Sequence, residues 1–294
     1  MKSLDITFII PFFGPPPAWM PFFLQSCNYN KGISFLIFAD CLDTGVYGNV
    51  EVIKWSLPQL KQLAEDKLRM PVSLDSPYKI CDLRPAFGLI FGDYLKGVNF
   101  WGTCDVDVIF GNIRKFITGE ILNEYDVITA KREYLIGHFT LYRNTRKVNL
   151  LFKKSADYRE VFQNPRAFVF DECNFLWWKL LAGQPILETK PQIDSMSHVV
   201  KRLAASGYIR AYFQTHVIEQ DKLTSLGQLE GFTQTLIWKN GDLMDAVEGE
   251  EYLSFHFHFL KKDPGFGIPA REKVPECFAI SQKGFSAIEE NVLF

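Results

Sequence analysis

The sequence predicts an α/β fold built on a largely parallel sheet, and two observations support this. Short runs of apolar, β-branched and aromatic residues have the composition of buried strands. These runs alternate along the chain with segments whose apolar residues recur at helical spacing. The chain has 294 residues, of which 47% are hydrophobic and 15% aromatic. This composition suits a compact globule that buries a sizeable core.

The first third of the chain contains most of the predicted sheet. Buried strands are predicted at residues 5–14, 33–41, 50–56 and 100–112, and helices at residues 19–30, 57–69 and 83–95. Asp82 precedes the third helix as a plausible N-cap. Ligands of such sheets bind beyond the carboxyl ends of the strands, where Asp40, Asp105 and Asp107 lie. Residues 1–111 are therefore interpreted as a nucleotide-binding-like half.

The remainder of the chain, residues 112–294, completes a single domain. A short helix is predicted at 112–122, strands at 125–130 and 137–144, a helix at 170–183 that Gly183 ends, and a strand at 252–262. We find no internal repeat and no low-complexity linker.

Charge and cysteine usage exclude several classes of function. The formal net charge is −2, so no global basic field recruits nucleic acid or anionic lipid. The six cysteines lack CxxC or zinc-like spacing, which indicates reduced thiols and a cytoplasmic protein. The N-terminal apolar run is interrupted by Asp5 and prolines, as in a first strand rather than a signal peptide. No run reaches the ~20 apolar residues of a membrane span, although the aromatic content could support peripheral membrane contact.

The stretch "FWGTCDVDVIFGN" carries the strongest chemical signal. Asp105 and Asp107 lie two residues apart in an apolar run, so on a strand their carboxylates share one face. Two like charges in an apolar setting require a positive partner. A divalent cation such as Mg²⁺ or Mn²⁺ would suit them and would neutralise a diphosphate leaving group. Alternatively, one carboxylate caps a turn and the other pairs with Arg114 or Lys115.

A second signal is the stretch "FHFHFLKK" near the end of the chain. Strand alternation places His256 and His258 on one face, and Lys261 and Lys262 follow. A neutral imidazole is a metal ligand, so either histidine could complete a metal site. An ordinary exposed histidine on a strand is the alternative.

Residues 78–111 resemble the GT-A glycosyltransferases, which use nucleotide sugars. Cation-dependent members carry a basic residue and an aspartate ahead of a helix, then a strand that ends in D-x-D; here these are Lys79, Asp82, the helix 83–95 and Asp105/Asp107. Over its whole length the chain also resembles an uncharacterised bacterial family. Its motifs match "IIPFFG" (9–14), "FWGTCDVDVIFGNIRKF" (100–116) and "GHFTLYRN" (137–144). The resemblance implies a GT-A fold, a Rossmann-like mixed sheet flanked by helices.

The same resemblance implies a donor site. The metal ligands would be Asp105, Asp107 and His258, with His256 as the second candidate, because "HFLKK" matches the family's spacing of histidine and basic residues. The base and ribose of a uridine-type nucleotide would contact the first loop and the second strand, and further residues would contact the rest of the nucleotide. These residues are Pro11, Phe12, Phe13, Asp40, Lys79, Asp82, Asp105, Lys261 and Lys262. For each phenylalanine alone, core packing is the alternative.

The resemblance also implies an acceptor side. Gly137 and His138 would line it, the glycine allowing close approach of a ligand. Asp171 and Glu172 begin a predicted helix, where inverting GT-A enzymes place the catalytic base. Carboxylates there are stabilised by the helix N-terminus and commonly serve only as caps. The order Asp-Glu departs from the usual Glu-Asp, so the choice between the two stays open.

Together these features predict a metal-dependent, inverting glycosyltransferase. It would move a hexose, such as galactose or galactofuranose, from a UDP-sugar to a hydroxyl of a bacterial surface glycan in capsule or lipopolysaccharide synthesis. The acceptor would be a lipid-linked saccharide, which places the protein in the cytoplasm at the inner membrane. One alternative is a non-catalytic nucleotide- or glycan-binding module. The other is a D-x-D phosphotransferase, although such enzymes carry a threonine where Ile109 stands.

Overall fold

A computed structural model of the chain describes residues 4–220, 230–269 and 273–288. The chain folds into two compact units, and it passes between them several times. The first unit comprises Met1–Pro15, Gly32–Asp105 and Thr118–Thr215, and the second comprises Pro16–Lys31, Val106–Ile117 and His216–Phe294. The predicted division into nucleotide-binding and acceptor-binding halves at residue 111 stays a prediction, because it concerns function whereas these units are defined by packing.

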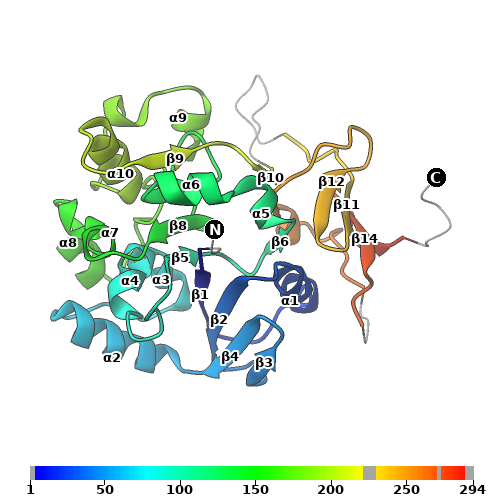
Figure 1. The fold of residues 1–294 in the computed structure, drawn as a ribbon, viewed down its shortest axis with the longest axis horizontal. Coiled ribbons are helices and arrows are strands. Elements are labelled where there is room, and N and C mark those ends of the chain that lie inside the picture. Colours follow the sequence, from blue (N-terminus) through cyan, green and yellow to red (C-terminus); the bar gives the residue numbers. More distant parts are fainter. Residues whose placement is uncertain (1–3, 221–229, 270–272, 289–294) are drawn as a thin grey trace. The chain divides into compact units, whose positions relative to one another are not determined.

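An eight-stranded mixed sheet forms the frame of the first unit, in the order β3-β4-β2-β1-β5-β8-β7-β9 (Figure 1). Strands β4, β2, β1, β5, β7 and β9 run in one direction, and β3 and β8 run in the other. The bounds are β1 (Ile6–Phe12), β2 (Ile33–Ala39), β3 (Gly45–Tyr47), β4 (Val50–Lys54), β5 (Phe100–Thr103), β7 (Val127–Thr129), β8 (Thr140–Arg143) and β9 (Ala211–Phe213). The strands predicted at 5–14, 33–41, 50–56, 125–130 and 137–144 are confirmed.

Helices cover this sheet through one apolar core. Phe38, Trp101 and Tyr142 from the strands share a buried cluster with Leu60 and Val199 from helices α2 and α10. The helical segments are α2 (Leu57–Leu68), η1 (Pro77–Lys79), α3 (Ile80–Leu83), η2 (Arg84–Ala86), α4 (Phe87–Ile90), α6 (Gly119–Glu124), α7 (Arg146–Asn149), η3 (Leu151–Lys154), α8 (Tyr158–Gln163), α9 (Trp177–Leu181), η4 (Ile186–Glu188) and α10 (Met196–Ala205). The predicted α/β fold class, a Rossmann-like mixed sheet flanked by helices, is confirmed.

The second unit is built on two small sheets and one longer helix. One sheet has the order β10-β13-β6 and the other the order β12-β11-β14-β15. Phe22, Trp238, Phe255 and Phe278 belong to its apolar core. The elements are α1 (Met20–Tyr29), β6 (Val108–Phe110), α5 (Ile113–Phe116), β10 (Val217–Glu219), β11 (Leu236–Lys239), β12 (Asp242–Asp245), β13 (Ser254–His256), η5 (Leu260–Lys262), β14 (Cys277–Ser281) and β15 (Gly284–Ala287).

No helix within the described residues has both the length and the apolar composition that crossing a membrane requires.

The prediction of a single strand at 100–112 is wrong. This segment forms two strands, β5 and β6, which belong to different sheets. Asp105 and Asp107 lie in the irregular segment between them. The inference that strand alternation places both carboxylates on one face therefore fails, although each carboxylate does have a positive partner, as described below.

Two predicted helices are shorter than expected. The helix 83–95 is replaced by the short segments α3, η2 and α4, because Pro85 cannot donate the intrahelical hydrogen bond of its turn and Gly88 and Gly92 favour helix weakly. The helix 170–183 is reduced to α9, because Asn174 and Phe175 adopt φ of 55° and 61°, which a right-handed helix excludes. Asp82 and Asp171 consequently do not begin helices.

The boundaries of two further predicted elements also differ in the structure. The segment 112–122 divides into α5 and α6, and the strand predicted at 252–262 contains only β13 before the chain turns into η5. Gly183 follows α9 with φ of 90°, as the prediction of a glycine stop required.

We predict that Gly102→Ala destabilises the first unit. A Cβ at this position in β5 would lie 2.6 Å from Leu141 Cδ2 and 2.8 Å from Phe8 Cε1, and both side chains are fully buried. Overpacking of this kind costs about 1–3 kcal/mol of unfolding free energy. Gly119→Ala in α6 is the control, because nothing lies within 4 Å of its added methyl group. Urea unfolding that ranks the two variants equally would contradict this packing.

Candidate active site

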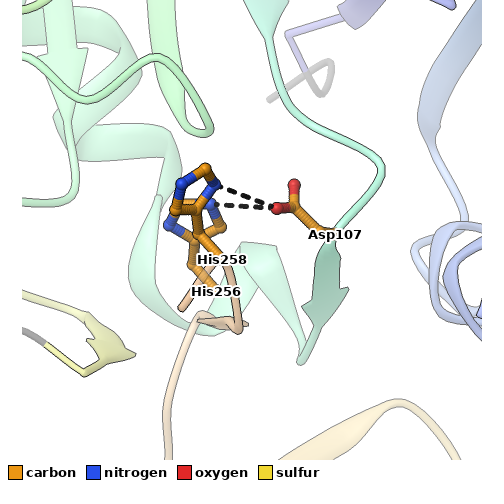
Figure 2. A group of neighbouring side chains, drawn as sticks. All are labelled: Asp107, His256 and His258. Carbon is orange, nitrogen blue, oxygen red and sulfur yellow. Dashed lines mark ion pairs between the residues drawn. The ribbon is translucent and has the colours of Figure 1, made fainter. Parts of the chain in front are cut away.

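One polar cluster lies entirely within the second unit and surrounds Asp107. We call Asp107, Glu219, His256, His258 and Lys261 the Asp107 cluster. Strand β13 pairs antiparallel with β6, so that His256 lies opposite Val108 and beside Asp107. His256 Nε2 and His258 Nδ1 each lie 3.6 Å from Asp107 Oδ2 (Figure 2). The Lys261 ammonium lies 2.5 Å from the same oxygen.

Burial determines the electrostatics of the Asp107 cluster. The side chain of Asp107 is only 6% exposed. Burial alone would raise the pKa of this carboxyl, but His256, His258 and Lys261 outweigh it and hold the pKa well below its usual range. Burial likewise opposes protonation of His256, but Asp107 and Glu219 raise the pKa of this imidazole to about 10. Glu219 Oε2 lies 3.2 Å from His256 Nδ1.

The cluster offers a donor set that fits a divalent metal ion. One carboxylate oxygen of Asp107 and one ring nitrogen each of His256 and His258 lie within 4.8 Å of one another. Two imidazoles with one carboxylate favour a divalent transition-metal ion over Mg²⁺, which takes oxygen ligands almost exclusively; Mn²⁺ accepts such a mixed donor set more readily than Mg²⁺. Because both histidines approach Asp107 equally closely, the distances do not rank His258 above His256.

A second polar cluster lies entirely within the first unit and surrounds Asp171. We call Arg84, Asp105, Gly137, Asp171 and Glu172 the Asp171 cluster. Arg84 contacts both aspartates, with Nη1 lying 3.0 Å from Asp171 Oδ2 and Nη2 forming an ion pair with Asp105. The Gly137 N–H donates to Glu172 Oε1 at 2.8 Å, and the Trp177 indole N–H donates to Glu172 Oε2 at 2.6 Å.

Gly137 is required by the space around it. A Cβ at this position would lie 2.3 Å from Arg84 Nη1 and 2.5 Å from Asp171 Oδ2. The absence of a side chain at residue 137 thus lets the backbone approach the ion pair, whereas the expected close approach of a ligand stays a prediction. His138, the other residue predicted for the acceptor side, is buried beside it.

Asp171 differs from the carboxylate that the sequence suggested. It was expected at a helix N-terminus, which would lower its pKa, but it lies in a turn six residues before α9. It is 4% exposed, and burial raises the pKa of its carboxyl well above the usual range despite Arg84. Val169 (φ 52°), Asn174 and Phe175 all adopt left-handed backbone conformations around it. For a β-branched valine this conformation costs of order 1–3 kcal/mol, so the surrounding contacts must hold the segment.

Lys79 and Asp82 provide such contacts from buried positions, and their contact with a nucleotide stays a prediction. They form a buried ion pair at 2.7 Å with side-chain exposures of 1% and 0%. The Lys79 ammonium also donates to the carbonyls of Val161 and Arg166, at 2.6 and 2.7 Å. The Asp82 carboxylate accepts the backbone N–H groups of Phe168 and Phe170, the residue before Asp171. The pair therefore anchors the chain that leads to Asp171.

The residues predicted to hold the base and ribose lie at the carboxyl ends of β1 and β2. Pro11 and Phe12 are partly exposed, whereas Phe13 belongs to the apolar core. Asp40 accepts the N–H of Gly14 at 2.8 Å, and this hydrogen bond lowers the pKa of its carboxyl. Their contact with a nucleotide stays a prediction.

Sequence reasoning missed two charged residues of these clusters. Arg84 lies in the segment 83–95, which the sequence predicts as a helix from its apolar residues alone. The need of two buried carboxylates for a cation is the signal that could have indicated Arg84. Glu219 lies in β10, for which no strand was predicted, and β10 reaches His256 by parallel pairing with β13.

Comparison with protein families identifies the family of the chain. Residues 8–289 match the model of DUF6625, a family of unknown function, and the chain belongs to it. No curated protein sequence matches the chain significantly. Among solved structures, the chain is similar to a galactosyltransferase, LgtC, crystallised in complex with donor and acceptor sugar analogues. The identity is 8%, the TM-score is 0.36, and the alignment covers 89% of this chain and 88% of that one.

We predict that Lys79→Met destabilises the fold by about 3–5 kcal/mol, because it leaves a buried carboxylate without its partner. The control is Lys67→Met. Lys67 pairs with Asp93, whose side chain is 62% exposed, and such surface pairs contribute about 1 kcal/mol or less. Chemical unfolding measures both values. A cost for Lys79→Met no larger than that for Lys67→Met would contradict the anchoring role.

We predict that Asp171→Asn changes how stability depends on pH. Because the pKa of Asp171 is raised in the folded protein, its protonated carboxyl contributes to the free energy of unfolding. This contribution is fully present below the carboxyl's unfolded pKa and is lost as the pH rises through the folded pKa. The variant lacks this loss, so its free energy of unfolding should gain on that of the parent as the pH rises above about 4, the carboxyl's unfolded pKa. A constant difference above this pH would show that the Asp171 pKa is not raised.

Proposed function

We propose that the chain is a metal-dependent glycosyltransferase of the GT-A type that moves a hexose from a UDP-sugar to a saccharide hydroxyl. The observation that carries the proposal is the Asp107 cluster. A buried carboxylate, two imidazoles and a lysine converge there from segments about 150 residues apart in sequence, as in a site for a metal-bound diphosphate.

Three residues would hold the metal ion in this proposal: Asp107, His256 and His258. When bound, the ion supplies positive charge that neutralises the departing diphosphate. Lys261 and Lys262 contribute further cations for the phosphate oxygens. Lys262 Nζ already lies 2.8 Å from His258 Nε2, which keeps its ammonium close to the cluster. Asp105, predicted as a further metal ligand, is paired with Arg84 in the structure, and its role in metal binding stays a prediction.

Asp171 is the base in this proposal. In the transfer step the acceptor oxygen bonds to the anomeric carbon, the bond from that carbon to the diphosphate oxygen breaks, and the hydroxyl proton passes to the Asp171 carboxylate. Within the part of the chain that the structure describes, Asp171 Oδ1 has no hydrogen-bond partner, whereas both Glu172 oxygens accept hydrogen bonds. This difference favours Asp171 over Glu172. A raised pKa also makes Asp171 a stronger base than an exposed carboxylate.

Arg84 orients this base and limits its basicity. Its guanidinium contacts Asp171 Oδ2, which leaves Oδ1 for the proton. The product of such direct displacement has the inverted anomeric configuration. Gly137 and His138 would border the acceptor, and Phe12 and Asp40 would contact the base and ribose. A lipid-linked glycan acceptor at the bacterial inner membrane, with galactose or galactofuranose as the sugar, completes the proposal.

A non-catalytic module is the second candidate, and one observation favours it. Asp171 is 4% exposed and paired with Arg84, so an acceptor would need to displace part of its surroundings to reach it. Such a module would bind UDP with metal but would neither hydrolyse nor transfer. The phosphotransferase alternative gains nothing from the structure, because Ile109 is fully buried in β6.

We predict that Asp107→Ala abolishes Mn²⁺-dependent UDP binding, because it removes the carboxylate shared by both histidines and Lys261. The control is Asp242→Ala, which removes an exposed partner of Lys115 from the same unit. Calorimetry with and without Mn²⁺ measures the affinities. UDP binding by Asp107→Ala that equals the parent would refute the metal centre.

The two histidine variants distinguish the ligands within the same assay. We expect His258→Ala and His256→Ala each to weaken UDP binding chiefly when Mn²⁺ is present, since both rings lie 3.6 Å from Asp107 Oδ2. Loss in only one variant would assign the metal ligand to that histidine. Unchanged Mn²⁺-dependent UDP binding in both variants would show that neither histidine is a metal ligand.

We predict that Asp171→Asn lowers transfer by about 10²–10⁴, the usual contribution of a general base, while UDP-sugar affinity is retained. Glu172→Gln serves as the matched variant and should lose less. Product NMR of the parent should show an inverted anomeric centre. A retained configuration, or full activity in Asp171→Asn, would remove the need for this base.

A further inference from the structure

A pocket of about 550 Å³ lies in the first unit, apart from the residues of both clusters. Its walls come from the carboxyl end of α2, from α4, and from α7 and η3. Four basic side chains line it, and no aspartate or glutamate does: Lys67, Arg69, Arg146 and Lys153. On a chain of net charge −2, four cations around one pocket make a local positive field.

Three of these cations are not neutralised nearby. Among residues 4–220, 230–269 and 273–288, the structure pairs no carboxylate with Arg69, Arg146 or Lys153. Lys67 contacts Asp93 at 2.6 Å, but the Asp93 side chain is 62% exposed, so this pair is weak. The pocket therefore keeps most of its positive charge available to a ligand.

Helix stabilisation accounts for only part of this arrangement. Lys67 and Arg69 lie at the carboxyl end of α2, where cations are favourable. Arg146 belongs to α7, a single turn of four residues whose dipole is too small to account for the position of the side chain.

Hydrogen bonds fix the position of Asn149, which lines the pocket. The Asn149 amide donates to Asn144 Oδ1 at 2.8 Å and to the Gly88 carbonyl at 3.3 Å, and it accepts the indole N–H of Trp101 at 2.7 Å. A Cβ on Gly88 would lie 2.4 Å from Asn149 Oδ1. Asn149 and Gly88 are therefore closely packed, so the four basic side chains of the lining are the groups that would recognise a ligand.

We infer that this pocket binds a phosphate-bearing anion, a phosphomonoester or a diphosphate group. Arginine guanidinium groups bind phosphate oxygens bidentately, and lysine adds point charge. The volume falls in the range of small-molecule sites, with room for a phosphate group and part of the molecule that carries it. The inference does not depend on the proposed glycosyl transfer, because none of the four cations belongs to the clusters around Asp107 and Asp171.

The test is titration of the full chain with inorganic pyrophosphate in the presence of EDTA, which separates this site from metal-dependent binding. We expect the double variant Arg69→Gln/Arg146→Gln to weaken pyrophosphate binding by about tenfold or more, as loss of two charge-assisted contacts implies. The control is Arg159→Gln/Lys190→Gln, which removes the same charge from exposed positions that do not line the pocket. Its affinity should equal that of the parent.

A second arm identifies the source of the phosphate. Vesicles of phosphatidylcholine with phosphatidic acid that bind the parent but not the pocket variant would assign the ligand to a lipid headgroup. Pyrophosphate binding without vesicle binding would assign it to a soluble phosphate compound; both outcomes support the site. No pyrophosphate binding by the parent, or equal affinity of the parent and the pocket variant, overturns the inference. The pocket variant should retain Mn²⁺-dependent UDP binding, so its outcome is separate from that of the proposed function.

Discussion

The buried carboxylate of Asp107 is the constraint on which the second unit's polar structure depends. A charge with 6% exposure is stable only where cations surround it. The pairing of β13 with β6 brings His256 to it, and the turn into η5 brings His258 and Lys261. Because this carboxylate stays ionised, the same groups that stabilise it in the protein form a donor set for a metal ion. Structure and proposed chemistry thus share one requirement, which is positive charge at Asp107 Oδ2.

The first unit neutralises its buried carboxylates around Asp171 in a different way. There a single guanidinium, that of Arg84, serves two carboxylates, and burial leaves Asp171 with a raised pKa. The strained backbone at Val169 is held by Asp82, which accepts the backbone N–H groups of the two neighbouring residues, Phe168 and Phe170. A buried ion pair can therefore determine where the proposed base lies. Gly137 matters for a similar reason, since only a glycine leaves room for the ion pair.

Much of the fold could be predicted from the sequence, because apolar runs and helical periodicity report burial directly. The strands β1, β2 and β4 and helix α2 follow from such patterns, whereas the short strand β3 was not predicted. The helices 83–95 and 170–183 failed because Pro85 and the left-handed residues near Asp171 interrupt helices in ways that apolar spacing does not reveal. The strand 100–112 failed because its two aspartates find cations in different units, and the chain breaks between them.

The candidate site was predicted in its residue types and less well in its partners. His256, His258, Lys261 and Asp107 do converge, as the resemblance to the GT-A glycosyltransferases implied, although they lie about 150 residues apart in sequence. Arg84 and Glu219 join the clusters through contacts with residues distant in sequence, which local patterns do not indicate. The motif that contains Lys79 likewise does not show that its side chain is buried. Long-range contacts of this kind decide which charged residues are structural and which are available to a substrate.

Pulsed electron paramagnetic resonance of the protein with bound Mn²⁺ would show whether the Asp107 cluster is a metal centre. Histidine ligation gives hyperfine coupling between the metal and an imidazole nitrogen. We predict nitrogen coupling in the parent that disappears when both His256 and His258 are replaced by alanine. A Mn²⁺ complex of the parent with oxygen ligands alone, and a spectrum unchanged by the double replacement, would contradict a metal centre in the Asp107 cluster.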